Sequence, residues 1–231
     1  MIRHGCSALL VLSHMRSYST LLAHLLHEHP KISGWEEQHR SYRTTSDLES
    51  LIAGQCNLPG VTVACDNLLH NGYSIGAPVY DDDRVRWVIS VRNARPTLKS
   101  MARWGGPKNI YRSGSAAADY YCGRLRWLMD VGSRLDGRFV LLRSDRLISQ
   151  PNVVRNGLTD ALGLDPPLSA TYTPAESTGE ASLGDFSRFI RAGTIVRERK
   201  YQLDPPLAAV DIRRSNEQRR LMIDTLVARA A

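Results

Sequence analysis

Short apolar runs alternate with segments whose apolar residues recur at helical spacing along most of this chain. The apolar runs predict buried strands at 8–12, 31–35, 61–64, 84–91 and 139–142. The helical spacing predicts helices around 21–26, 46–53, 116–135, 153–162 and 215–230, and a further helix is expected to start at about 97. Strands that alternate with helices indicate an α/β fold with a mainly parallel central sheet flanked by helices.

One domain is expected over residues 1–231, because no linker rich in Pro, Gly or Ser divides the chain. Prolines and polar residues make the segment at about 165–205 irregular, and we interpret it as an insert or a lid over a site. A C-terminal helix is expected within 213–231, with Ser46 or Asp47 as the N-cap of the helix at 46–53.

Two arginines follow predicted strands directly and therefore belong to the same edge of the sheet. Arg16 comes after the first apolar run, and Arg92 comes after the run at 84–91. Ligands of parallel α/β sheets bind beyond the carboxyl ends of the strands. The sequence thus predicts a site that contains both arginines.

The loop after the first strand has the chemistry of an anion site. Arg16 supplies a guanidinium, and hydroxyls come from Ser17, Ser19 and Thr20. The following helix start adds backbone N–H groups without intrahelical partners and a partial positive charge. A P-loop of the form G-x-x-x-x-G-K-[ST] is absent, so the loop suits phosphate or sulfate bound without a metal.

Net charge and the spacing of the cysteines limit which partners and which kinds of site are expected. The chain of 231 residues has 30 Lys and Arg against 23 Asp and Glu, a formal charge of +7 that favours anionic partners. The arginines are dispersed, which argues against a nucleic-acid-binding tract. The four cysteines and the histidines at 24, 27 and 29 show no metal-ligand spacing, so reduced thiols and no metal site are expected. Without an apolar leader or span, the expected protein is cytoplasmic.

The loop and the second arginine together resemble the sulfotransferases that use 3′-phosphoadenosine 5′-phosphosulfate (PAPS). Arg16-Ser17-Tyr18-Ser19-Thr20-Leu21 resembles that family's R-S-G-[ST]-T-L loop, which binds the 5′-phosphosulfate. Arg92 and Ser100 have the family's eight-residue spacing for the 3′-phosphate. The resemblance implies a P-loop-NTPase-like sulfotransferase fold, PAPS as donor, 3′-phosphoadenosine 5′-phosphate (PAP) as product, and no metal.

A narrower resemblance is to tyrosylprotein sulfotransferases and related bacterial enzymes, in which His-Pro and then Gly-Glu-Glu follow the loop. This chain has His29-Pro30 and Trp35-Glu36-Glu37 at matching distances. The resemblance implies that Glu37 is the catalytic base, with Arg16 acting on the transferring group. Glu36, His39, His70 and the substrate itself stay open as alternative bases.

Three departures from the family pattern are visible. Tyr18 replaces the loop glycine, so it must either tolerate the loop geometry or turn its ring onto a ligand. Asn67 and His70 stand where the family often has a lysine, which leaves leaving-group assistance to Arg16. The late R-K-G loop is absent, and 177–179 or 184–187 is expected in its place.

The function expected from these residues is in-line transfer of a sulfuryl group to an acceptor hydroxyl. The acceptor is open between sugar, lipid, phenol, peptide and natural-product hydroxyls, and the oligomeric state is open too. The alternatives are a P-loop-like nucleotide kinase and a non-enzymatic basic nucleic-acid-binding protein. Neither nucleic acid nor a membrane span is expected for the sulfotransferase interpretation.

Overall fold

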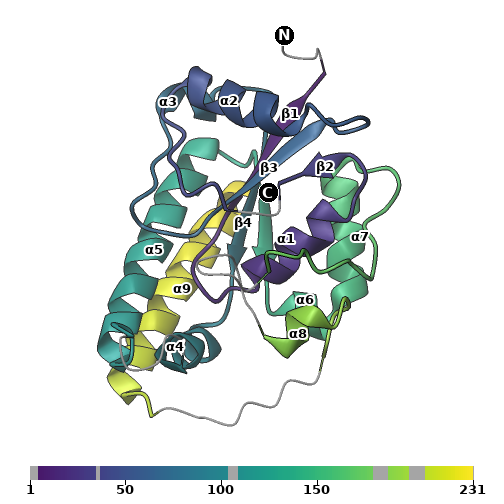
Figure 1. Cartoon of the computed structure of the whole chain (residues 1–231). Helices are drawn as coiled ribbons and strands as arrows, with labels where there is room; N and C mark the ends of the chain where they lie inside the picture. The colour runs from purple at the N-terminus through teal and green to yellow at the C-terminus, as the bar shows by residue number, and fades with distance from the viewer. Residues whose placement is uncertain (1–4, 35–36, 104–108, 179–186, 198–205, 231) are drawn as a thin grey trace.

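Five parallel strands form the central sheet in the order β2-β3-β1-β4-β5 (Figure 1). The strands are β1 (Ser7–Leu12), β2 (Ile32–Ser33), β3 (Val63–Leu68), β4 (Val85–Val91) and β5 (Val140–Arg143). The computed structural model describes residues 5–34, 37–103, 109–178, 187–197 and 206–230. The predicted single α/β domain with a parallel sheet is confirmed.

The strand β1 lies at the centre of the sheet and is buried on both faces. Its side chains alternate, so Ala8, Leu10 and Leu12 enter one hydrophobic core while Leu9 and Val11 enter the other. This two-sided burial explains why the sequence shows a continuous apolar run there.

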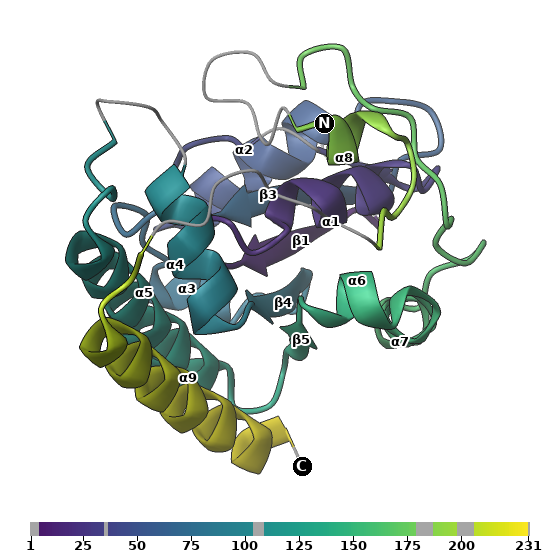
Figure 2. The ribbon, with the colours of Figure 1, turned by 90° about the horizontal axis from the view of Figure 1, so that it is seen from below.

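Helices cover both faces of the sheet, as Figure 2 shows from below. The first core contains side chains of α2 (Thr45–Gln55), α3 (Ala77–Tyr80), α4 (Ala94–Arg103), α5 (Gly114–Leu135) and α9 (Ala209–Ala230). The second core contains side chains of α1 (Ser19–His27), α6 (Arg146–Ser149), α7 (Pro151–Leu162) and α8 (Arg188–Arg191). The helices α5 and α9 pack along each other (Figure 1).

Several predicted boundaries were wrong for identifiable reasons. The strand β3 runs to Leu68 instead of ending at residue 64, because the polar Asp66 and Asn67 are buried within it. The strand β2 has only two described residues, at the sheet edge. The cap of α2 is Thr44, which forms a capping box with Asp47, so neither predicted N-cap was right.

The chain order places a topological switch point at β1. The strand pairs with β3 on one side and with β4 on the other, and Leu12 lies opposite both Leu68 and Ile89. The loops that follow these three strands therefore meet at one edge of the sheet. Parallel α/β sheets bind ligands at this kind of position.

The predicted absence of disulfides is consistent with the fold, because all four cysteines are buried free thiols. Among the helices that the structure describes, none is both long and apolar enough to cross a membrane.

Candidate active site

The loop between β1 and α1 adopts an unusual backbone conformation at two positions. Arg16 and Tyr18 have φ values of 62° and 66°, in the left-handed region. Each costs about 1 kcal/mol or more for a residue with a side chain. Tyr18 thus adopts a conformation that glycine would adopt more easily, and its carbonyl accepts the hydrogen bond from Leu22 N that begins α1.

The hydroxyl of Ser17 lies buried inside this loop. Its Oγ has no hydrogen-bond partner among the residues that the structure describes. A buried hydroxyl without a partner costs about 1–3 kcal/mol. The loop therefore offers a donor to a ligand, next to the N–H groups of the first turn of α1.

The structure brings the two predicted halves of the site together. Arg16 Nε donates a hydrogen bond to Ser100 Oγ at 2.9 Å, and Arg92 Nη1 donates to Arg16 O at 3.0 Å. Ser100 lies on α4 and Arg92 directly after β4. The prediction that Arg16 and Arg92 share one edge of the sheet is confirmed.

Arg92 is buried and engaged by protein groups on several sides. Its Nη2 donates to Tyr18 Oη at 2.7 Å, and its Cζ lies 4.0 Å from the centroid of the Tyr18 ring. Its Nε lies 3.7 Å from Asp145 Oδ1. The ring of Tyr18 has turned onto Arg92, so this arginine holds the loop in place as well as contributing positive charge.

A buried histidine that the sequence did not single out joins the ends of β1 and β4. His14 Nε2 accepts a hydrogen bond from Arg92 N at 3.0 Å, so Nδ1 carries the proton and donates to Met15 O at 2.9 Å. Burial lowers the pKa of His14 to about 3, and the imidazole is neutral. Through these two hydrogen bonds, His14 fixes the position of the Arg92 backbone relative to the loop that follows β1.

A buried arginine was missed as well. Arg124 on α5 donates to the backbone carbonyls of Ser13 at 2.7 Å, His70 at 2.9 Å and Leu68. Burial lowers its pKa to about 10, so it stays charged near neutral pH. A lone arginine in a helical pattern predicts a surface residue, so no sequence signal distinguished it.

Tyr120 completes this support of the loops. Its hydroxyl accepts a hydrogen bond from Met15 N at 3.0 Å and donates one to Leu69 O at 2.7 Å. With Arg124, it ties the end of β1 to the end of β3.

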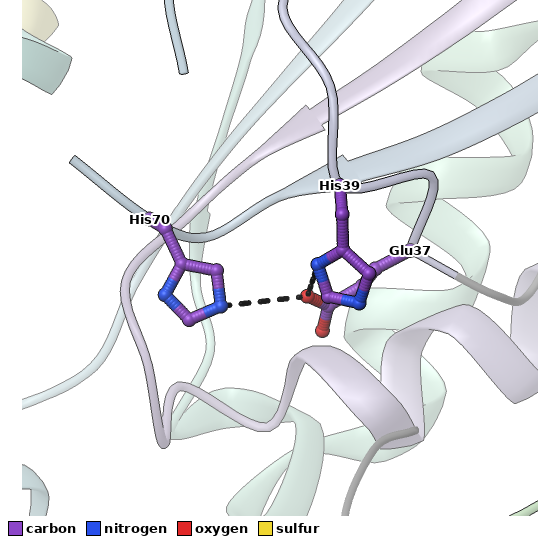
Figure 3. Close-up of side chains that lie close together, drawn as sticks. All are labelled: Glu37, His39 and His70. Atoms are coloured by element: carbon purple, nitrogen blue, oxygen red, sulfur yellow. Dashed lines mark ion pairs between the residues drawn. The ribbon is translucent and has the colours of Figure 1, made fainter. Parts of the chain in front are cut away.

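Glu37 lies on the segment after β2, beside two histidines (Figure 3). Its Oε2 is 3.9 Å from His39 Nδ1 and 3.8 Å from His70 Nε2. The side chain is 14% exposed, and burial together with the charge of Asp66 raises the pKa of Glu37 to about 8. His39 and His70, which the sequence left open as alternative bases, are therefore both neighbours of Glu37.

Asp66 organises the segment that carries Glu37. Its carboxylate accepts hydrogen bonds from Gln38 N at 2.9 Å, Asn67 N at 2.7 Å and the Tyr42 hydroxyl at 2.7 Å. Burial raises the pKa of Asp66 to about 6. The end of β3 thus anchors the loop that follows β2.

The remaining predicted residues divide into described and undescribed ones. Ser19 and Thr20 begin α1, and the Thr20 carbonyl accepts from His24 Nδ1 at 2.7 Å. Thr178 Oγ1 lies 2.9 Å from the buried His24 Nε2, so the segment before residue 179 packs against α1. Glu36 and residues 179 and 184–186 lie outside the described residues.

Comparison with known proteins gives a clear result for the fold. No protein-family model matches the sequence, and no curated protein matches it. The sulfotransferase domain from the curacin biosynthetic pathway superposes with a TM-score of 0.60 at 17% identity, covering 93% of this chain and 98% of that one. The sulfotransferase domain from the Synechococcus PCC 7002 olefin synthase gives 0.58 at 15% identity, covering 95% and 98%. The chain has the fold of these sulfotransferase domains over nearly its whole length.

Proposed function

We propose that this protein transfers a sulfuryl group from PAPS to a hydroxyl of an acceptor molecule. The observation that carries the proposal is the convergence of Arg16, Arg92 and Ser100 at the switch point of a sheet that has the fold of sulfotransferase domains. These residues come from segments far apart in the sequence. Each segment alone matches the family pattern weakly, whereas their meeting at one edge of the sheet brings two guanidinium groups and a hydroxyl together for an anionic ligand.

The loop residues would bind the phosphosulfate end of the donor. The Ser17 hydroxyl, the first N–H groups of α1 and the hydroxyls of Ser19 and Thr20 supply donors without any metal. Arg16 lies between this loop and Ser100, so its guanidinium can contact either phosphate end. Arg92 and Ser100 would bind the 3′-phosphate, with Arg92 sharing its donors between the ligand and Tyr18.

Transfer is an in-line displacement at sulfur. The acceptor oxygen forms a bond to sulfur, the bond from sulfur to the bridging phosphate oxygen breaks, and PAP leaves with that electron pair. Glu37 takes the acceptor's proton, and Arg16 stabilises the negative charge on the departing phosphate. A general base contributes on the order of 10²–10⁴-fold. Burial raises the proton affinity of the Glu37 carboxylate and its pKa to about 8, so the deprotonated form that accepts the proton becomes the major one only above about pH 8.

Calorimetric titration of the full chain with PAP tests the nucleotide site. We expect saturable binding, and a loss of roughly tenfold or more in affinity in Arg16→Ala, since a charge-assisted contact to phosphate is removed. Arg126→Ala is the matched control, because Arg126 is an exposed arginine on α5 with the same charge. Absence of binding at millimolar PAP would exclude the proposal.

The nucleotide-kinase alternative predicts the opposite order of nucleotide affinities in the same calorimetric titration. A P-loop-like kinase binds ATP with magnesium in preference to PAP. The sulfotransferase proposal requires PAP to bind more tightly than ATP, with no dependence on magnesium. Steep salt-dependent binding to nonspecific DNA or RNA would instead favour a nucleic-acid-binding protein.

A further inference from the structure

The described residues contain one group of three metal-ligating side chains of mixed type, Glu37, His39 and His70. Their ligand atoms all lie within 4.8 Å of one another (Figure 3). We infer that these three side chains form a binding site for a divalent transition-metal ion of the Zn²⁺ class. The sequence could not indicate it, because Glu37 and His39 follow β2 whereas His70 follows β3.

The three side chains already lie close to the positions that ligands of one zinc ion would need. The Glu37 oxygen lies 3.9 Å and 3.8 Å from the nearest nitrogens of His39 and His70. Ligands of a tetrahedral zinc ion bind at roughly 2.0–2.2 Å, which sets them about 3.3–3.6 Å apart. Small side-chain rotations therefore bring all three atoms onto one ion, with a fourth position left for water.

The donor set selects the kind of ion. Two imidazoles and one carboxylate suit Zn²⁺ and similar borderline ions, whereas Mg²⁺ and Ca²⁺ prefer oxygen ligands only. The nearest other contact of His39 Nδ1 is Tyr73 Oη at 3.1 Å, a hydrogen bond that metal binding replaces.

Charge also favours a cation at this position. Among the described residues, the groups within ion-pair distance of Glu37 are two imidazoles, and neither a Lys nor an Arg. The cluster therefore lacks a permanent positive partner that a divalent ion would have to displace.

An ion can reach the cluster from solvent. The side chains of His39 and His70 are 38% and 41% exposed, whereas Glu37 is 14% exposed. The two imidazoles line the solvent side, and the carboxylate forms the inner ligand. Because an ion here occupies the oxygen that would accept the acceptor's proton, bound zinc would inhibit the proposed transfer.

Calorimetric titration of the full chain with zinc chloride tests the inference. We expect one ion per chain with micromolar affinity, and roughly tenfold or more weakening in His39→Ala and in His70→Ala. His27→Ala is the matched control, because His27 is an exposed histidine on α1, outside the cluster. Thermal melting by circular dichroism checks that each variant is folded.

The visible absorption spectrum of bound Co²⁺ gives a second readout, which weak binding to scattered surface side chains does not produce. Co²⁺ bound by two imidazoles and a carboxylate in four-coordinate geometry has intense visible absorption, which Zn²⁺ should quench by displacement and Mg²⁺ should not. Equal zinc affinity in the wild type and the folded double variant H39A/H70A would overturn the inference. So would the absence of zinc binding at millimolar concentration.

The inference does not depend on the proposed function. PAP titration of the same samples reads the nucleotide site separately, so loss of one binding event leaves the other measurable.

Discussion

Tyr18 occupies part of the Arg92 guanidinium, the group that we propose binds an anionic ligand. Its hydroxyl accepts a hydrogen bond from Arg92 Nη2, and its ring lies against the guanidinium. Replacement by phenylalanine keeps the ring and removes the competing acceptor. We expect Tyr18→Phe to bind PAP about threefold to tenfold more tightly, since a phosphate oxygen then takes the released donor. Calorimetry measures this, and weaker binding would show instead that the hydroxyl itself contacts the nucleotide.

His14 makes the stability of the fold depend on pH. The pKa of His14 is about 3 in the fold and about 6.5 in the unfolded chain, so the unfolded state binds the extra proton as pH falls through this range. The stability that neutral His14 contributes is intact above about pH 6.5 and is lost progressively below that pH. At about pH 5 the loss in free energy of unfolding reaches about 2 kcal/mol.

The variant His14→Asn isolates this contribution, because its amide does not titrate and can still donate to the Met15 carbonyl. Between about pH 7 and pH 5 we expect its free energy of unfolding to fall by about 2 kcal/mol less than that of the wild type. Urea titrations at each pH measure the difference. Parallel pH profiles for the two proteins would contradict a neutral buried His14.

At the scale of elements, Arg124 connects the helix α5 to the ends of two strands. Its guanidinium satisfies three backbone carbonyls at the ends of β1 and β3 and lies 4.0 Å from the ring centroid of Trp127. Removing the guanidinium takes one donor from each of these carbonyls; those of Leu68 and His70 keep hydrogen bonds from Ser13 N and Tyr73 N, whereas the Ser13 carbonyl loses its charged donor. We expect Arg124→Met to lower the free energy of unfolding by about 3–5 kcal/mol.

Denaturant unfolding measures this loss, with Arg126→Met as the control two residues along the same helix. The control should change stability by less than about 0.5 kcal/mol, because Arg126 is exposed. Similar effects of the two substitutions would show that Arg124 does not hold the strand ends together. Where Arg124→Met remains folded, we expect weaker PAP binding, because the loop after β1 loses support.

The elements that could be predicted from sequence are those whose apolar pattern reflects burial directly. The strands β1 and β4 are buried on both faces, so their runs of apolar residues stand out. The end of β3 escaped prediction because Asp66 and Asn67 are buried polar residues, stabilised by contacts with distant segments. The start of α4 also came earlier than expected, since Pro96 fits within the first turn of a helix.

In the whole molecule, the parallel topology of the sheet brings together residues that no local sequence pattern connects. It brings the loops after β1, β3 and β4 to one edge, so Arg16 and Arg92 lie together there, as their places after strands predicted, and Ser100 contacts Arg16. The supporting residues His14 and Arg124 could not be found in this way. Each is a single polar residue whose role depends on backbone groups far away in sequence.

The same topology sets Glu37 beside His39 and His70, on loops from neighbouring strands. Whether Glu37 acts as the base is separable from whether the loop binds the donor. Glu37→Gln removes the proton acceptor and leaves the loop after β1 unchanged, so it should slow transfer without abolishing PAP binding.

Mass spectrometry of a metabolite extract incubated with PAPS and the full chain tests the proposed sulfuryl transfer. We predict an acceptor that gains the mass of one sulfuryl group while PAP forms in equal amount, with no product in Arg16→Ala and strongly reduced product in Glu37→Gln. Intact PAPS with every acceptor class, together with a phosphorylated product from ATP and magnesium, would contradict sulfuryl transfer by this protein.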